Sequence, residues 1–141
     1  MKRLITSVCV AVLLAAVLAA PAEAGTRTLK GPVDGGGTFK FKLRVHNGTP
    51  VKAGNFKARR IPVECDNGPV EKVRFSLDAF IDVNGAGEFE YDFSSFNAHL
   101  DGTIKPNNRK ATGEISYGPS DVGGSDNCTT GGLRGYTAKK I

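Results

Sequence analysis

Apolar and polar residues alternate with a period of two along several short stretches of this chain. In the clearest stretch, residues 38–45, four apolar residues alternate with three cations. The apolar members are Phe39, Phe41, Leu43 and Val45, and the cations between them are Lys40, Lys42 and Arg44. Because successive side chains of a β-strand point to opposite faces, this pattern predicts a strand with one apolar face and one cationic face.

Similar patterns predict six further strands, separated by turns rich in Asn, Asp, Gly and Pro. Five of them are residues 56–65, 89–93, 96–100, 111–117 and 133–140. The segment 70–81 is ambiguous, because its apolar residues fit either a strand face or a helical stripe; we favour the strand. Its apolar strand face would comprise Val73, Phe75, Leu77, Ala79 and Ile81.

Two features disturb the strand at residues 56–65. The alternation slips by one position at Arg59 and Arg60. Such a slip would turn every later side chain to the wrong face, so we expect a β-bulge there. Pro62 lacks a backbone N–H, which predicts that this strand lies at a sheet edge.

Three glycine-containing segments are expected to be connections. Residues 118–132 are polar and glycine-rich without strand alternation, and we expect a loop anchored by Cys128. The run 35–37 precedes a strand, so we interpret it as a flexible lead-in rather than a phosphate-binding loop. Residues 82–87 begin like a calcium loop, but Ala86 stands where an oxygen ligand is required, which favours an Asn-Gly turn.

The N-terminus has the pattern of a cleaved signal peptide. Lys2 and Arg3 precede an apolar run, and Ala22 and Ala24 supply the small residues of a cleavage site. We therefore divide the chain into a signal peptide, residues 1–24, and a single secreted domain, residues 25–141. Seven short strands in this domain predict an all-β fold, either a compact antiparallel sandwich or a small barrel.

The composition of the secreted domain narrows its class. Removing residues 1–24 leaves 117 residues with 17 basic and 13 acidic side chains, a net charge of +4. No apolar stretch after residue 24 approaches the roughly 20 residues that span a bilayer, so we expect no transmembrane segment and a soluble monomer. The chain has no Trp, which disfavours a lectin that stacks sugars on aromatic rings.

Export affects the redox state expected for the two cysteines of this domain. An oxidising compartment favours their pairing, and Cys65 and Cys128 have only each other. Closing so long a loop should stabilise the fold by about 4 kcal/mol. A structural zinc site needs four ligands, whereas the domain offers two distant cysteines and two histidines, so we expect neither a metal centre nor a cofactor.

Several strand-and-turn motifs resemble those of small secreted bacterial β-domains of actinobacterial type. They are GTFKF at 37–41, LDGTI at 100–104, ATGEI at 111–115, CTTG at 128–131 and YTAK at 136–139. The resemblance covers most of the secreted domain in order and implies an exported β-fold with one disulfide. It carries over no catalytic residues. Tyr136 departs from the pattern, in which Trp is frequent in the last strand.

A carboxylate-rich patch with one imidazole is the first candidate site. Pairing Phe93 with Phe96 in a hairpin would place Glu90 opposite His99, Asp92 opposite Asn97 and Glu88 opposite Asp101 on the outward face. A hydrolase would use Glu90, Asp92, His99 and Asp101, with His99 as the only candidate base. An open sheet face supplies neither the burial nor the cleft that separates carboxylate pKa values, so we interpret the patch as a solvated surface.

The charge distribution offers the second candidate site. Residues 25–80 carry 11 basic and 5 acidic side chains, whereas residues 81–141 carry 6 basic and 8 acidic ones. The basic candidates for an anion-binding surface are Lys40, Lys42, Arg44, Lys57, Arg59 and Arg60. The competing interpretation is that these cations blunt sheet edges and keep the protein soluble.

These observations favour a non-catalytic, secreted β-domain that acts as a binding or structural module at the cell exterior. Acidic cell-wall polymers or anionic surfaces fit that compartment, and we expect no nucleic-acid partner. The alternatives are a small extracellular hydrolase that uses the carboxylate and histidine patch, or a carrier of a small apolar ligand inside a barrel.

Overall fold

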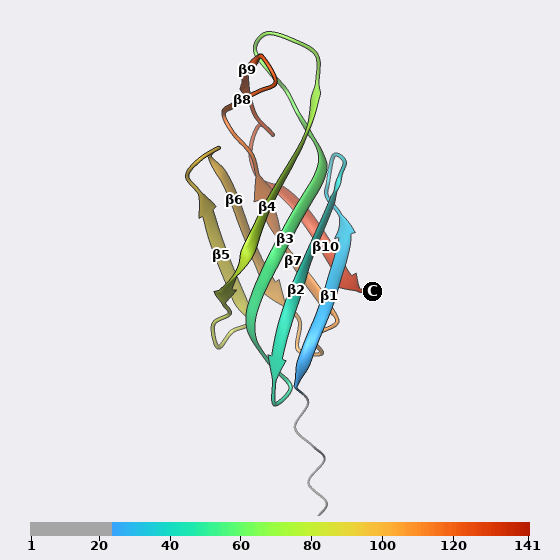
Figure 1. Cartoon of the computed structure of the whole chain (residues 1–141). Helices are drawn as coiled ribbons and strands as arrows, with labels where there is room; N and C mark the ends of the chain where they lie inside the picture. Colours follow the sequence, from blue (N-terminus) through green and yellow to red (C-terminus); the bar gives the residue numbers. More distant parts are fainter. Residues whose placement is uncertain (1–23) are drawn as a thin grey trace, which may run out of the picture.

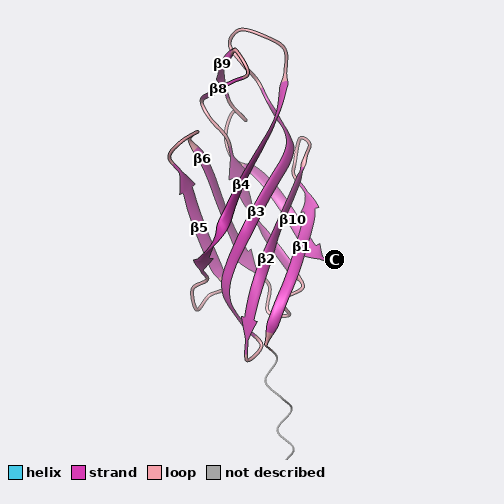
Figure 2. Cartoon of the chain, in the orientation of Figure 1, coloured by secondary structure: helices cyan, strands magenta, loops and turns pink. Residues whose placement is uncertain are grey.

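The computed structural model describes residues 24–141, and within them it contains strands and turns but no helix (Figure 2). The strands are β1 (Gly25–Pro32), β2 (Thr38–His46), β3 (Thr49–Val63), β4 (Glu71–Asp82), β5 (Glu88–Phe93), β6 (Ala98–Ile104), β7 (Lys110–Ser116), β8 (Ser120–Val122), β9 (Ser125–Cys128) and β10 (Arg134–Lys140). The described part of the chain therefore has no helix able to cross a membrane. Apart from Ala24, the predicted signal peptide lies outside the described residues.

Eight strands form one antiparallel sheet in the order β4-β3-β2-β1-β10-β7-β6-β5, and β8 and β9 form a separate hairpin (Figure 1). The first and last strands, β1 and β10, are neighbours in the middle of this order. The sheet curls until its end strands, β4 and β5, face each other. The fold is thus a nearly closed barrel, the second of the two predicted architectures.

All seven predicted strands are present, although β3 begins at Thr49 instead of Phe56 and β6 begins at Ala98 instead of Phe96. Three further strands, β1, β8 and β9, were not predicted. The pattern analysis misses β1, in which Leu29 is the only buried residue, because so short an apolar signal does not stand out. It also assigns residues 118–132 to a loop, although β8 and β9 lie there. The run 35–37, interpreted as a flexible lead-in, forms the turn of the β1–β2 hairpin, with all three glycines at positive φ. The ambiguous segment 70–81 is a strand, β4.

The irregularity predicted at Arg59 and Arg60 is confirmed. The pairing with β4 shifts between Ala58 and Ile61, and Arg60 has a positive φ of 56°. The edge position predicted from Pro62 is wrong, because β3 lies between β2 and β4. The pairing with β2 ends at Arg59, so Pro62 lies beyond the last residue that needs a β2 partner.

A second irregularity corrects the predicted face of β4. The β3–β4 register shifts between the pairs Gly54–Phe80 and Phe56–Leu77, which leaves an extra residue on β4. As a result Ala79 is exposed, although the alternation places it on the apolar face with Leu77. The bulge instead brings Phe80 to the outer surface, where the guanidinium of Arg44 lies over its ring.

Aromatic side chains fill the barrel. Phe39, Phe41 and Phe56 are at most 1% exposed, and they lie on the inward positions of β2 and β3. Phe89 from β5 contacts Phe41 and Phe56 across the interior, with ring centroids 5.4 and 5.5 Å away. At the open seam, Phe75 of β4 packs edge-on against Phe93 of β5 at 5.6 Å. Side chains therefore close the barrel where backbone pairing between its end strands is missing.

Tyr136 of β10 completes this interior. Its hydroxyl donates a hydrogen bond of 2.8 Å to the carbonyl oxygen of Asp101. Burial, with the negative charge of Asp101 adding to it, raises the pKa of Tyr136 far above its usual range, so the hydroxyl stays protonated. A Cβ at Gly113 would lie 2.7 Å from the Tyr136 hydroxyl, and one at Gly102 would meet the same group. The two glycines thus make room for the phenol.

The disulfide Cys65–Cys128 attaches the β8–β9 hairpin to the connection between β3 and β4, at the top of Figure 1. Beside it, Glu64 and Thr129 exchange backbone hydrogen bonds of 2.9 and 2.8 Å. The amide of Asp66 donates to the carbonyl oxygen of Asp126 at 2.9 Å. The bridge therefore joins segments that already pair locally.

We expect the double substitution Cys65→Ser and Cys128→Ser to lower the free energy of unfolding by about 4 kcal/mol, because it frees a long loop in the unfolded chain. Urea titration followed by circular dichroism measures this difference. Reduced wild-type protein is the control and should show the same loss. A loss below about 1 kcal/mol would mean that the backbone pairing around Glu64 and Thr129 holds the hairpin without the bridge.

Candidate functional site

The six cations singled out from the sequence do lie on one outer surface. We call this surface, formed by β2 and β3, the cationic face; it carries Lys40, Lys42, Arg44, Lys57, Arg59 and Arg60, all of them exposed. Strand alternation places five of these side chains outside, because the apolar residues between them fill the barrel, and Arg60 is exposed at the β3 bulge. Lys40 lies directly opposite Lys57, and Arg59 lies opposite Thr38.

The members of the cationic face differ in their surroundings. Arg44 is held over the ring of Phe80, with its guanidinium carbon 3.9 Å from the ring centroid. Lys40, Lys42 and Lys57 instead line an open hollow of about 360 Å³, together with Asn55 and Asp78. The three ammonium groups leave this hollow predominantly positive, since Asp78 is the one acid that lines it.

The register extends the positive surface beyond the predicted residues. Five exposed lysines are consecutive cross-strand partners, and we call them the lysine row: Lys110 on β7, Lys139 on β10, Lys30 on β1, Lys40 on β2 and Lys57 on β3. Sequence reasoning missed Lys30, Lys110 and Lys139, because their adjacency depends on strand order. Of the three, only Lys139 falls within a predicted strand, whose alternation places it on the outward face.

Like charges directly opposite each other in a sheet destabilise it, so the lysine row carries an energetic cost. Within residues 24–141, none of its five lysines forms an ion pair that would offset this cost. Lys52 on β3 shows the usual arrangement by contrast, with its ammonium 2.7 Å from the Asp82 carboxylate of the neighbouring strand.

The predicted pairing within the carboxylate patch is wrong by two residues. Phe93 pairs with Ala98 instead of Phe96, which places Asp92 opposite His99 and Glu90 opposite Asp101. Glu88, predicted opposite Asp101, lies opposite Thr103. The cause is the turn: four residues, 94–97, connect the strands, and Asn97 adopts the positive φ. The two-residue turn assumed from the sequence favours Asn or Gly at its centre, whereas this chain has two serines there.

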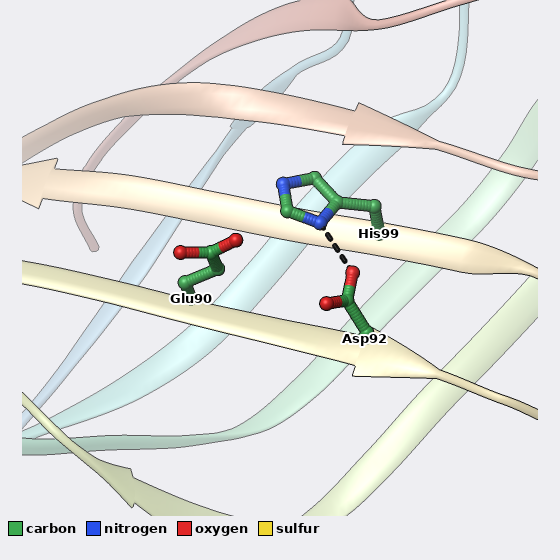
Figure 3. Close-up of side chains that lie close together, drawn as sticks. All are labelled: Glu90, Asp92 and His99. Atoms are coloured by element: carbon green, nitrogen blue, oxygen red, sulfur yellow. Dashed lines mark hydrogen bonds and ion pairs between the residues drawn. The ribbon is translucent and has the colours of Figure 1, made fainter.

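The corrected register gives His99 a carboxylate partner on each ring nitrogen. Its Nδ1 lies 2.6 Å from an Asp92 oxygen (Figure 3), and its Nε2 lies 3.3 Å from an Asp101 oxygen. The other oxygen of Asp101 accepts a hydrogen bond from the Glu114 amide at 3.0 Å. Partial burial, the largest single effect, lowers the pKa of His99, but the hydrogen bonds and charges of Asp92 and Asp101 together raise it above 6.5.

This arrangement stabilises an imidazolium and does not resemble an activated nucleophile. Both ring nitrogens face carboxylates, so neither is directed at a hydroxyl that it could deprotonate. Ligand atoms of Glu90, Asp92 and His99 do lie within 4.8 Å of one another (Figure 3), a mixed nitrogen and oxygen donor set. An ion bound there would have to replace the hydrogen bond between Asp92 and His99, on a sheet face that does not enclose it.

The raised pKa of His99 predicts a pH-dependent stability. A group whose pKa is higher in the folded state stabilises the fold fully below its unfolded pKa and loses that contribution as the pH rises through the folded value. The variant His99→Gln should therefore be less stable than wild type at pH 6, by less than about 1 kcal/mol because Asp92 is solvent-exposed, and equally stable at pH 9. Urea titrations across this range test the expectation.

The matched control for this experiment is His46→Gln, which changes the exposed histidine at the end of β2. It should leave the difference between the two pH values as it is in wild type. If His99→Gln also keeps the wild-type pH profile, the pairing of His99 with Asp92 and Asp101 does not stabilise the protein in solution.

The chain matches no protein-family model, no curated protein and no solved structure. The resemblance of its motifs to small secreted bacterial β-domains therefore stays an expectation. Its function has to be inferred from the charges and geometry of its own residues.

Proposed function

We propose that this protein is a non-catalytic binding module of the cell exterior that contacts acidic polymers or anionic surfaces through the cationic face. The observation that carries the proposal is the gathering of the exposed cations of the cationic face on β2 and β3, none of which forms an ion pair within residues 24–141. Electrostatic attraction to such a surface is non-directional and favours a partner with many negative charges over one small ligand.

The competing interpretation is that these cations protect sheet edges and keep the protein soluble, and the strand order bears on the first of these two roles. Edge strands are the ones exposed to unwanted pairing, and lysine is a common defence there. In this barrel the end strands are β4 and β5, whereas Lys40, Lys42 and Arg44 lie on β2, which pairs on both sides. Edge protection therefore does not account for the cationic face.

The extracellular location rests on two supports. Residues 1–24 have the pattern of a signal peptide, and Cys65 and Cys128 form a disulfide of the kind that persists in oxidising compartments. The alternative of a small apolar-ligand carrier has weaker support, because the inward positions of β2, β3 and β5 are occupied by packed phenylalanine rings.

Co-sedimentation tests the proposal. Oxidised protein, residues 25–141, is mixed with purified bacterial wall or with vesicles containing phosphatidylglycerol, at low salt and at about 0.5 M salt, where the Debye length falls to about 4 Å. Wild type should sediment with at least one of these anionic partners at low salt and be released at high salt. The charge-reversal variant Lys40→Glu, Lys42→Glu, Arg44→Glu should stay in solution.

A second reversal variant controls for net charge. Lys52→Glu, Lys72→Glu, Lys105→Glu changes the total charge by the same amount outside the cationic face and should still sediment. If wild type stays in solution with every anionic partner at low salt, the cations serve solubility alone and the proposed function is wrong.

A further inference from the structure

The lysine row runs around the circumference of the barrel, across its strands. Its members occupy successive strands from β7 through β10, β1 and β2 to β3, so it crosses five of the eight strands. Neighbouring strands lie about 4.8 Å apart, and the four steps of the row therefore cover about 19 Å. Half of the lysines in residues 24–141 are gathered in this one line.

We propose that the lysine row binds a linear acidic polysaccharide that lies across the strands and wraps around the barrel. This inference rests on the proposed function, and it adds the path and the chemical class of the ligand. The row places lysines directly opposite one another on consecutive strands, and each anionic group bound between two of them relieves the repulsion between their charges.

Curvature distinguishes a polymer from a membrane surface. Figure 1 shows β3, β2 and β1 on the near side of the barrel and β7 behind them, so the row passes from one side of the molecule to the other. A flat bilayer would contact only the few lysines on the side that faces it. A flexible chain can follow the curve and contact Lys57 at one end and Lys110 at the other.

The spacing and the neighbouring side chains favour a polysaccharide over other linear polyanions. A chain with one carboxylate or sulfate per sugar has a charge repeat comparable to the distance between strands, whereas duplex DNA carries a charge every ~1.7 Å. Thr112, Thr137 and Thr38 each lie two residues from a lysine of the row, on the same outward face of their strands. Their hydroxyls can donate to and accept from sugar hydroxyls.

The acidic side of the barrel limits where such a chain can lie. Thr112 and Thr137 line an open hollow of about 480 Å³ whose other walls include Asp34, Asp101 and Glu114. These carboxylates would repel a polyanion that moved away from the lysines. The threonines therefore form the boundary between the part of the outer surface that attracts the polymer and the part that repels it.

The test uses the three lysines of the row that lie outside the cationic face, so that the two proposals can fail separately. The row variant is Lys30→Gln, Lys110→Gln, Lys139→Gln, and its matched control is Lys52→Gln, Lys72→Gln, Lys105→Gln. The probe is sodium polygalacturonate, a linear polyuronate, and affinity is measured by titration calorimetry at several salt concentrations.

The row variant should bind polygalacturonate roughly 10- to 100-fold more weakly than wild type at low salt. The slope of log Kd against log salt should fall by about two, since three fewer counterions are released. The control should bind within about threefold of wild type. The row variant should also be at least as resistant to urea as wild type, because neutral residues relieve the repulsion, so weaker binding cannot reflect unfolding.

Oligogalacturonates of increasing length provide a second readout. Affinity should rise with each added sugar up to about five charges, the number of lysines in the row, and then level off. Equal affinity of the row variant and wild type would overturn the row as the binding path while leaving the cationic face as a binding surface. Tighter binding of wild type to phosphatidylglycerol vesicles than to polygalacturonate would overturn the polysaccharide in favour of a membrane surface. Absence of binding to every anionic probe would overturn both proposals.

Discussion

The barrel is held closed from inside, by aromatic side chains that contact one another from strands without a shared backbone ladder. Phe89 on β5 reaches Phe41 on β2 and Phe56 on β3, and Phe75 on β4 packs against Phe93 across the open seam. Aromatic pairs of this kind contribute about 0.5–1.5 kcal/mol each beyond the area they bury. Without these contacts no interaction would hold the end strands β4 and β5 against each other. The sheet would then lose the curvature that shapes its outer surface.

Because packed side chains fill the interior of the barrel, a partner can contact only the outer surface. Alternation assigns every second residue of each strand to that surface, and closure then makes the surface convex and continuous. Its two halves differ in charge: lysines face outward around β1, β2 and β3, whereas Glu90, Asp92 and Asp101 surround His99 on β5 and β6. One part of the surface therefore attracts anions and the other repels them, which confines a polyanion to the part that carries the lysine row.

The two halves also differ in whether their positive charges have carboxylate partners. His99 is flanked by Asp92 and Asp101, which stabilise its protonated form, so the positive charge of this imidazolium is balanced by its neighbours at mildly acidic pH. The lysine row has no such balance, and its repulsion lowers the stability of the free protein. A cost of this kind is reasonable at a binding surface, because the partner removes it, and it is hard to reconcile with a surface that serves solubility alone.

Much of the fold could be predicted from the sequence, because apolar and polar residues alternate with a period of two along a strand that has one buried face. Seven strands, the bulge at Arg60 and the pairing of Cys65 with Cys128 follow from residues close in sequence or from the lack of another partner. The β5–β6 register could not be predicted, since it depends on the length of the connecting turn, which alternation does not reveal: four residues, with Asn97 at positive φ. The lysine row depends on the order of strands in the whole sheet: Lys30 lies opposite Lys139 because the first strand, β1, pairs with the last, β10. For the strands with a regular alternation, the sequence by itself determined which side chains face outward, whereas at the β4 bulge the tertiary structure decided this too. Only the tertiary structure decided which outward side chains are neighbours, because neighbours across a sheet are set by strand order, bulges and closure of the whole barrel.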